Sequence, residues 1–232
     1  MRDQSEKIYE LQWNAFAEDI KRNNRFFFQR ELELDLLESI LTRLTKVYPV
    51  NHEFYRARIS DEQLSTDELG KPLFNQASPG RANPVGIPYL YVSESEETTL
   101  YETRISLHES ITIGRFRLVK PLQVISLKNI ANYGPFAVQD IGFELNEFIE
   151  YRPYLLMLES QLSKPVRKQD VHLDYLPTQF LCEYIKSLDF DAIEYRSAMK
   201  TEGYNLAIFN DQKLECIDAK FYQVKGIKYG WK

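Results

Sequence analysis

Two arginines occupy alternate positions of one short segment, a spacing that places both side chains on the same face of a β-strand. In residues 52–60 (HEFYRARIS), Arg56 and Arg58 alternate with Tyr55 and Ala57. A guanidinium group that faces a protein core needs an anion, and a pyrophosphate fits its planar fork through paired hydrogen bonds. A strand face that is open to solvent would explain the same pattern. The segment therefore indicates an anion site or an exposed strand face.

A third arginine, Arg81, lies in a loop rich in glycine and proline, SPGRANPVGIP (residues 78–88). Binding residues concentrate in such loops, although many loop arginines are simply exposed. The strand predicted next carries Tyr89 and Tyr91 on one face, and the alternation alone does not separate their roles. An aromatic ring there can stack on a planar ligand, whereas core packing is the commoner role of a strand tyrosine.

A short helix is predicted after this strand, over residues 96–104. Ser93 or Ser95 can cap its first turn, and the spacing of Ser93 and Glu96 fits a capping box. Glu102 lies near the end of this helix, where most glutamates are solvated surface residues. Position alone thus makes Glu102 a weak candidate for chemistry.

The rest of the chain mixes helices and short strands in no regular alternation, which predicts an α+β domain with a largely antiparallel or mixed sheet. Helices are predicted over residues 5–23, 31–48, 96–104, 144–162 and 177–188, and strands over 52–60, 89–93, 111–119, 122–127, 191–196, 205–209 and 214–217. Because Pro49 stops the second helix, we expect a helical segment over residues 1–49 and a main domain over 50–232.

Bulk properties exclude several classes of protein. The formal net charge of −5 argues against direct binding of nucleic acid. Cys182 and Cys216 stand far apart, as do the three histidines, so no metal site is expected. There is no apolar run of roughly 20 residues that could cross a membrane, and no secretory signal. These features predict a cytoplasmic protein that spans no membrane.

Four stretches, in this order, resemble the RES domain family, which is named for its Arg, Glu and Ser. They are FYRAR (54–58), GRANPVGIPYLY (80–91), TLYETR (99–104) and YLPTQFLCEYIKSLDFDAIEYRS (175–197), and NLAIF closes the set. The resemblance implies a fold similar to ADP-ribosyltransferases of the diphtheria-toxin type, with a mixed or antiparallel sheet core and flanking helices. The family's functional positions match Arg56, Arg81, Tyr91, Glu102 and Ser197.

The family consists mostly of bacterial toxins that degrade NAD⁺ or transfer ADP-ribose, and many are partnered by an antitoxin with an Xre-like helix-turn-helix domain. The resemblance therefore implies NAD⁺ as a substrate, with no cofactor or metal, and an antitoxin or another neutralising protein as a partner. The N-terminal helices resemble a HEPN-like extension found on some members. Arg43 and His52 are too far apart in sequence for the ribonuclease motif of HEPN proteins. The apolar faces of these helices should pack on the main domain or on another chain, which allows a homo-oligomer.

Cleavage of the nicotinamide–ribose bond sets simple chemical demands. Nicotinamide leaves as a neutral molecule without a general acid, and the ribose develops oxocarbenium character that a carboxylate can stabilise. Glu102 is the candidate for that carboxylate. Arg56 and Arg81 would bind phosphates, and Tyr91 would stack on nicotinamide. Ser197, whose plainer role is that of a turn residue, would bind the amide or the ribose.

Three functions remain open at this point. The first is an NAD⁺ glycohydrolase or phosphorylase that acts as a toxin or defence effector, with Glu102, Arg56 and Tyr91 as its catalytic residues. The second is a protein ADP-ribosyltransferase, and the third is a catalytically silent binding module. A serine hydrolase and a Rossmann oxidoreductase are disfavoured because neither G-x-S-x-G nor G-x-G-x-x-G is present.

Overall fold

The computed structural model describes residues 2–27, 32–164 and 171–227. Its helices are α1 (Arg2–Arg22), α2 (Leu34–Arg43), α3 (Glu96–Thr103), α4 (Pro135–Asp140), α5 (Leu145–Ser163), α6 (Val171–Asp174) and α7 (Leu176–Ser187). Its strands are β1 (Thr45–Tyr48), β2 (Glu53–Ile59), β3 (Leu90–Ser93), β4 (Ser110–Leu118), β5 (Leu122–Ser126), β6 (Ala192–Arg196), β7 (Tyr204–Ile208) and β8 (Leu214–Gln223).

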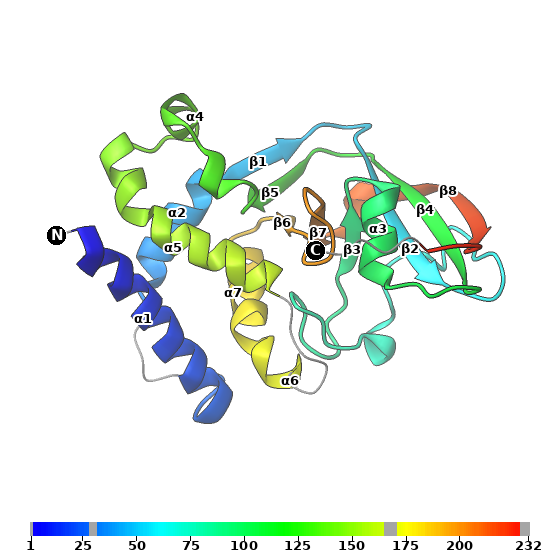
Figure 1. The fold of residues 1–232 in the computed structure, drawn as a ribbon, viewed down its shortest axis with the longest axis horizontal. Helices are drawn as coiled ribbons and strands as arrows, with labels where there is room; N and C mark the ends of the chain where they lie inside the picture. The colour runs from blue at the N-terminus through cyan, green and yellow to red at the C-terminus, as the bar shows by residue number, and fades with distance from the viewer. Residues whose placement is uncertain (1, 28–31, 165–170, 228–232) are drawn as a thin grey trace.

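These strands form one mixed sheet in the order β1-β5-β6-β7-β3-β2-β4-β8. The β5–β6 pair is parallel, and the other neighbouring pairs are antiparallel. Figure 1 shows the larger helices gathered at one end of this sheet, while α3 lies over its other half, beside β2 and β3. The prediction of an α+β fold with a mixed sheet and flanking helices is confirmed.

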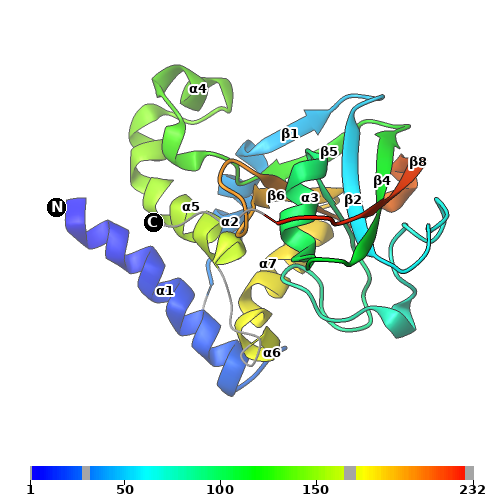
Figure 2. The same cartoon turned by 45° about the vertical axis from the view of Figure 1, so that its right-hand side comes forward.

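The helices at the N-terminal end share a hydrophobic core with the helices of the main domain. Trp13 and Phe16 of α1 and Leu37 of α2 are buried in one cluster with Leu155 of α5 and Leu181 of α7. Figure 2 shows α1 lying along α5 and reaching the end of α7. The apolar faces of α1 and α2 therefore pack on the main domain, and the division of the chain near residue 50 stays a prediction.

The predicted helix over residues 31–48 is wrong at its C-terminal end. The helix ends at Arg43, and Thr45–Tyr48 form β1, which pairs with residues 122–125 of β5. The apolar spacing of Leu44 and Val47 continues the helical pattern, but Val47 is 58% exposed. The segment is a strand because its backbone pairs with β5. That partner lies far away in the sequence, so a local apolar pattern does not reveal the pairing.

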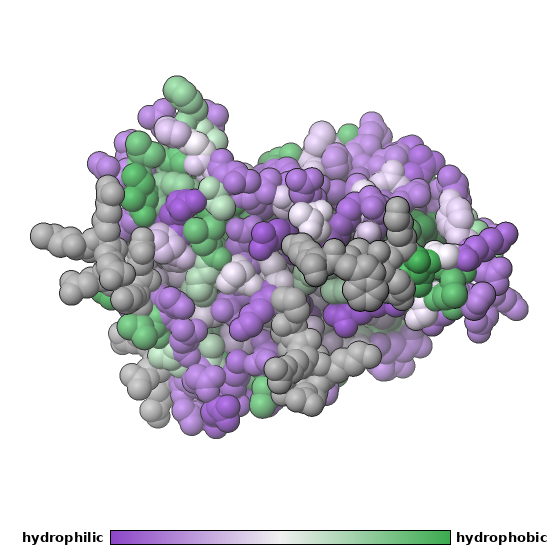
Figure 3. All heavy atoms as spheres, in the orientation of Figure 1, coloured by the Kyte–Doolittle hydropathy of each residue, from purple (hydrophilic) through white to green (hydrophobic). Residues whose placement is uncertain are grey.

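The surface is predominantly polar on the face shown in Figure 3, with apolar side chains gathered mainly over the end that carries α4 and α5. No helix of the described part of the chain is long and apolar enough to cross a lipid bilayer. Within the same residues, no group of three or more histidine, cysteine, aspartate or glutamate side chains is arranged to hold a metal ion.

Candidate active site

A cavity opens where two neighbouring strands of the sheet separate. β2 and β3 are paired at Tyr55 and Ser93 alone, whereas β2 pairs with β4 along its whole length. The cavity has a volume of about 310 Å³. It is lined by Tyr55, Arg56, Ala57, Tyr91, Val92, Ser93, Thr99, Glu102, Thr103, Tyr195 and Asn205. Three of the residues predicted from sequence, Arg56, Tyr91 and Glu102, therefore meet in one cavity.

Arg56 crosses the gap between the two strands. Its Nη1 donates a hydrogen bond of 3.0 Å to the Tyr91 carbonyl oxygen, and its Nε is buried without a partner among the described residues. Burial, and then the nearby Arg58, lowers the pKa of Arg56 to about 10, so the group is charged at neutral pH. A buried, charged and incompletely bonded guanidinium is a strong site for an anion.

Tyr91 is fixed by the loop that precedes its strand. Its hydroxyl donates to Asn83 Oδ1 at 2.7 Å and accepts from the Ala82 amide at 3.1 Å. A Cβ added at Gly80 would lie 2.6 Å from this hydroxyl, so glycine permits the close approach. Tyr89 differs from Tyr91 because it packs against Phe209 in the core and does not line the cavity.

Glu102 projects from α3, and one of its two carboxylate oxygens accepts hydrogen bonds while the other accepts none among the described residues. Ser95, and not Ser93, caps the helix by accepting the Thr98 amide. Glu102 Oε1 accepts hydrogen bonds from Ser197 Oγ at 2.5 Å and from Asn205 Nδ2 at 2.7 Å. Among the described residues, Oε2 accepts no hydrogen bond and the carboxylate forms no ion pair. The free oxygen is available to a positively charged group in the cavity.

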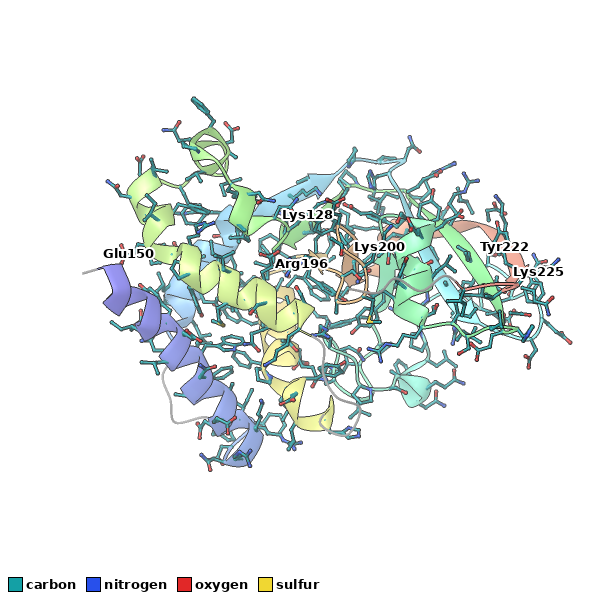
Figure 4. All side chains as sticks on the ribbon, viewed as in Figure 1. Lys128, Glu150, Arg196, Lys200, Tyr222 and Lys225 are labelled. Carbon is teal, nitrogen blue, oxygen red and sulfur yellow. The ribbon has the colours of Figure 1, made fainter. Side chains whose placement is uncertain are left out.

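Ser197 and Arg81 lie beside the cavity and do not line it. Ser197 Oγ donates to Glu102 and accepts the amides of Met199 and Lys200, so it stabilises a turn and positions Glu102. Figure 4 shows Lys128, Arg196 and Lys200 gathered around this turn. The position of Ser197 indicates indirect action, and direct contact of Ser197 with substrate stays a prediction.

Arg81 joins its loop to two helices. Its Nη1 donates to the Gln161 carbonyl oxygen of α5 at 3.2 Å, its guanidinium lies over the ring of Tyr175, and its own carbonyl accepts from Thr178 of α7. These contacts give Arg81 a structural role at the edge of the site. Its contact with a phosphate stays a prediction.

Asn205 and Tyr195 are site residues that the sequence reasoning did not single out. Asn205 is 5% exposed, and its Oδ1 accepts from Ser93 Oγ at 2.6 Å while its Nδ2 holds Glu102. Both residues occur in stretches that resemble the RES domain, NLAIF and DAIEYRS. A polar residue that opens an otherwise apolar strand segment was the available signal for Asn205.

The arrangement can accommodate a ligand with an anionic part near Arg56 and a cationic part near Glu102, between the flat apolar rings of tyrosines. The family model described as RES domain matches residues 53–231. The chain belongs to the RES domain family.

Comparison with curated proteins found no match. Among solved structures, the chain is similar to a chain of the M. tuberculosis MbcT–MbcA toxin–antitoxin complex, known from a crystal structure. The two chains are 16% identical, the similarity covers 82% of this chain and 93% of the other, and the TM-score is 0.48.

Proposed function

We propose that this protein cleaves the bond between nicotinamide and ribose in NAD⁺. The observation that supports this most directly is the shared cavity of Arg56 and Glu102. Among the described residues, one guanidinium nitrogen and one carboxylate oxygen there have no hydrogen-bond partner. NAD⁺ carries a pyrophosphate for the arginine and a ribose that becomes positively charged as the bond breaks. Membership of the RES domain family agrees with this reading.

In the proposed reaction, the C–N bond breaks and its electron pair leaves with nicotinamide, which departs as a neutral molecule. Glu102 Oε2 stabilises the positive charge that develops on the ribose, as preorganised charges do at other active sites. An oxygen of the acceptor then bonds to the same carbon. The chain needs no cofactor or metal ion for these steps, because NAD⁺ is itself the substrate.

The acceptor is water or inorganic phosphate. Among the described residues that line the cavity there is no histidine, and Glu102 is the one carboxylate. Water must lose a proton when it attacks, whereas phosphate is already anionic at neutral pH and can be held by arginine. This composition favours phosphate, which would give ADP-ribose 1″-phosphate, over water, which would give ADP-ribose.

The test is incubation of the purified protein with NAD⁺, with and without phosphate at constant ionic strength, followed by mass analysis of the products. Release of nicotinamide that accelerates with phosphate, together with the phosphorylated product, supports the proposal. ADP-ribose as the sole product, at a rate indifferent to phosphate, would show a glycohydrolase. Covalent labelling of a protein would instead indicate an ADP-ribosyltransferase, and the absence of nicotinamide would indicate a silent binding module.

As the biological role we propose a bacterial toxin or defence effector that acts in the cytoplasm and is neutralised by an Xre-like antitoxin or another protein. The support is family membership and the proposed depletion of NAD⁺. Expression of the chain in bacteria should arrest growth and lower cellular NAD⁺, and Glu102→Gln should remove both effects. Equal arrest by the two chains would separate toxicity from this site.

A further inference from the structure

A straight row of four side chains forms one wall of the cavity. Strand register places Tyr195 of β6 opposite Asn205 of β7, Asn205 opposite Ser93 of β3, and Ser93 opposite Tyr55 of β2. Directly opposed residues project from the same face of a sheet with their Cβ atoms about 5 Å apart. All four residues line the cavity, so Tyr195 lies beside the residue that holds Glu102.

The hydroxyl group of Tyr195 has no hydrogen-bond partner among the described residues, although the residue is buried. Tyr195 is 6% exposed, and its hydroxyl makes no hydrogen bond within the described part of the chain. Tyr89, by contrast, has a hydroxyl that is sealed in the core without a partner. Tyr195 lines the cavity, and its hydroxyl, unlike that of Tyr89, is not among the sealed atoms that lack a partner, so it remains accessible to a molecule bound there. Tyr195 lies on β6, an inner strand of the sheet. It therefore presents an unbonded hydroxyl group to the cavity.

The surroundings of Tyr195 make this hydroxyl a hydrogen-bond donor. Burial, followed by smaller effects of Tyr91 and Glu102, holds the pKa of Tyr195 well above its ordinary value. The phenol therefore keeps its proton at physiological pH, and the open Glu102 oxygen lies on the same side of the sheet. A group bound between the Tyr195 hydroxyl and the Glu102 carboxylate must accept a hydrogen bond from the hydroxyl and lie next to the carboxylate. A hydroxyl oxygen of the ribose meets both conditions.

We propose that the Tyr195 hydroxyl donates a hydrogen bond to a hydroxyl oxygen of the ribose that Glu102 faces. The inference rests on the proposed cleavage of NAD⁺ and adds a substrate-binding residue to it. A buried polar group that is matched by a substrate oxygen contributes strongly to recognition, because the group has no alternative partner when that oxygen is missing.

The test compares Tyr195→Phe with Tyr89→Phe. Each change deletes one phenolic oxygen that has no hydrogen-bond partner among the described residues. The oxygen of Tyr89 is sealed in the core, whereas Tyr195 lines the cavity. We expect Tyr195→Phe to lower kcat/KM for NAD⁺ by about 10- to 100-fold with no fall in Tm, and Tyr89→Phe to retain the full rate. An activity loss without a stability loss separates substrate binding from a structural role.

Equal kcat/KM for Tyr195→Phe and the unchanged chain would overturn this inference while leaving the proposed function intact. A fall in Tm that matches the fall in activity would overturn it too, because it would assign the hydroxyl a role in folding. If the unchanged chain releases no nicotinamide from NAD⁺, the proposed function fails, and the ribose contact fails with it.

Discussion

The carboxylates of Glu194 and Glu102 are both held by hydroxyl groups of the sheet region, but their surroundings differ. Glu194 on β6 is fully buried, and it accepts hydrogen bonds from Tyr48 and Ser126, both at 2.6 Å. Lys46 also forms an ion pair with it at 3.2 Å. Both oxygens and the charge of Glu194 are therefore satisfied by protein.

Glu102 receives two hydrogen bonds from neutral groups and no ion pair among the described residues. Alternation along β6 turns Glu194 away from the face to which Tyr195, and with it the cavity, belongs. A carboxylate with its cation supplied by protein stabilises the fold, whereas one that lacks a cation can stabilise positive charge on a substrate. The two carboxylates thus differ in that Glu194 is paired with a lysine, whereas Glu102 is paired with none among the described residues. Variants of both sites test this difference.

Removal of the N-terminal segment should lower thermal stability more than any other change proposed around Glu194. A chain that starts at Val50 lacks Lys46 and Tyr48, and it also lacks the buried faces of α1 and α2. Glu194 is fully buried whereas Lys46 is 39% exposed, and leaving the buried carboxylate without these partners costs about 1–3 kcal/mol. We expect the shortened chain to lose its cooperative thermal transition in circular dichroism. Full-length Tyr48→Phe is the control and should unfold cooperatively at a lower Tm; an unchanged Tm of the shortened chain would contradict the shared core.

Arg56→Lys should weaken the binding of NAD⁺ in the cavity that contains Glu102. Lysine lacks the planar fork that reaches both the Tyr91 carbonyl and an anion. The dissociation constant for NAD⁺, measured by calorimetry in a Glu102→Gln background that slows turnover, should rise by about tenfold or more. Arg58→Lys is the matched control, since Arg58 bonds the exposed Glu68 carbonyl instead. Equal affinities for the two lysine variants would remove Arg56 from the site.

Arg81→Ala, measured in the same way, should have a smaller effect than Arg56→Lys, because Arg81 lies beside the cavity and is held by the Gln161 carbonyl. A larger effect of Arg81→Ala would show that the phosphates bind nearer to α5 than we infer.

Glu194→Gln should lower stability more than Glu102→Gln does. The amide keeps the shape but removes the negative charge from the hydrogen bonds of Tyr48 and Ser126, a loss of about 1–3 kcal/mol. The Glu102 change should stay within about 0.5 kcal/mol, as surface substitutions do. Urea unfolding of both variants gives the comparison, and the reverse order would show that Glu102 is the structural carboxylate.

Asn205→Asp should change the pH dependence of turnover. The new carboxylate would face Glu102 at the position of the present 2.7 Å hydrogen bond, and two neighbouring carboxylates do not ionise independently. The acid side of the pH–rate profile should therefore move to higher pH by about one unit. Ser93→Ala, which removes only the outer partner of Asn205, should leave the profile near its original position. Identical profiles for all three chains would exclude Asn205 as a positioning residue.

Local sequence patterns predicted many of the helices and strands and some of the residues that line the cavity. Apolar periodicity predicted α1, Pro177 indicated the start of α7, and alternation predicted β2. The family resemblance brought Arg56, Tyr91 and Glu102 to attention. Local pattern failed at β1, whose partner β5 lies more than seventy residues further along the chain. It also did not show Tyr195 and Asn205, because their meeting depends on the register between β6 and β7. Register is set by tertiary pairing, which single-strand patterns do not contain.

We propose that Glu102, and not Glu194, is the carboxylate that supports cleavage of NAD⁺. Release of nicotinamide by Glu102→Gln and by Glu194→Gln, both assayed well below the lower Tm, tests it directly. We expect a loss of about 10²–10³-fold for Glu102→Gln, as for removal of one electrostatic stabiliser, and a nearly unchanged rate for Glu194→Gln. A folded Glu102→Gln protein that releases nicotinamide at the rate of the unchanged chain would rule out this role of Glu102.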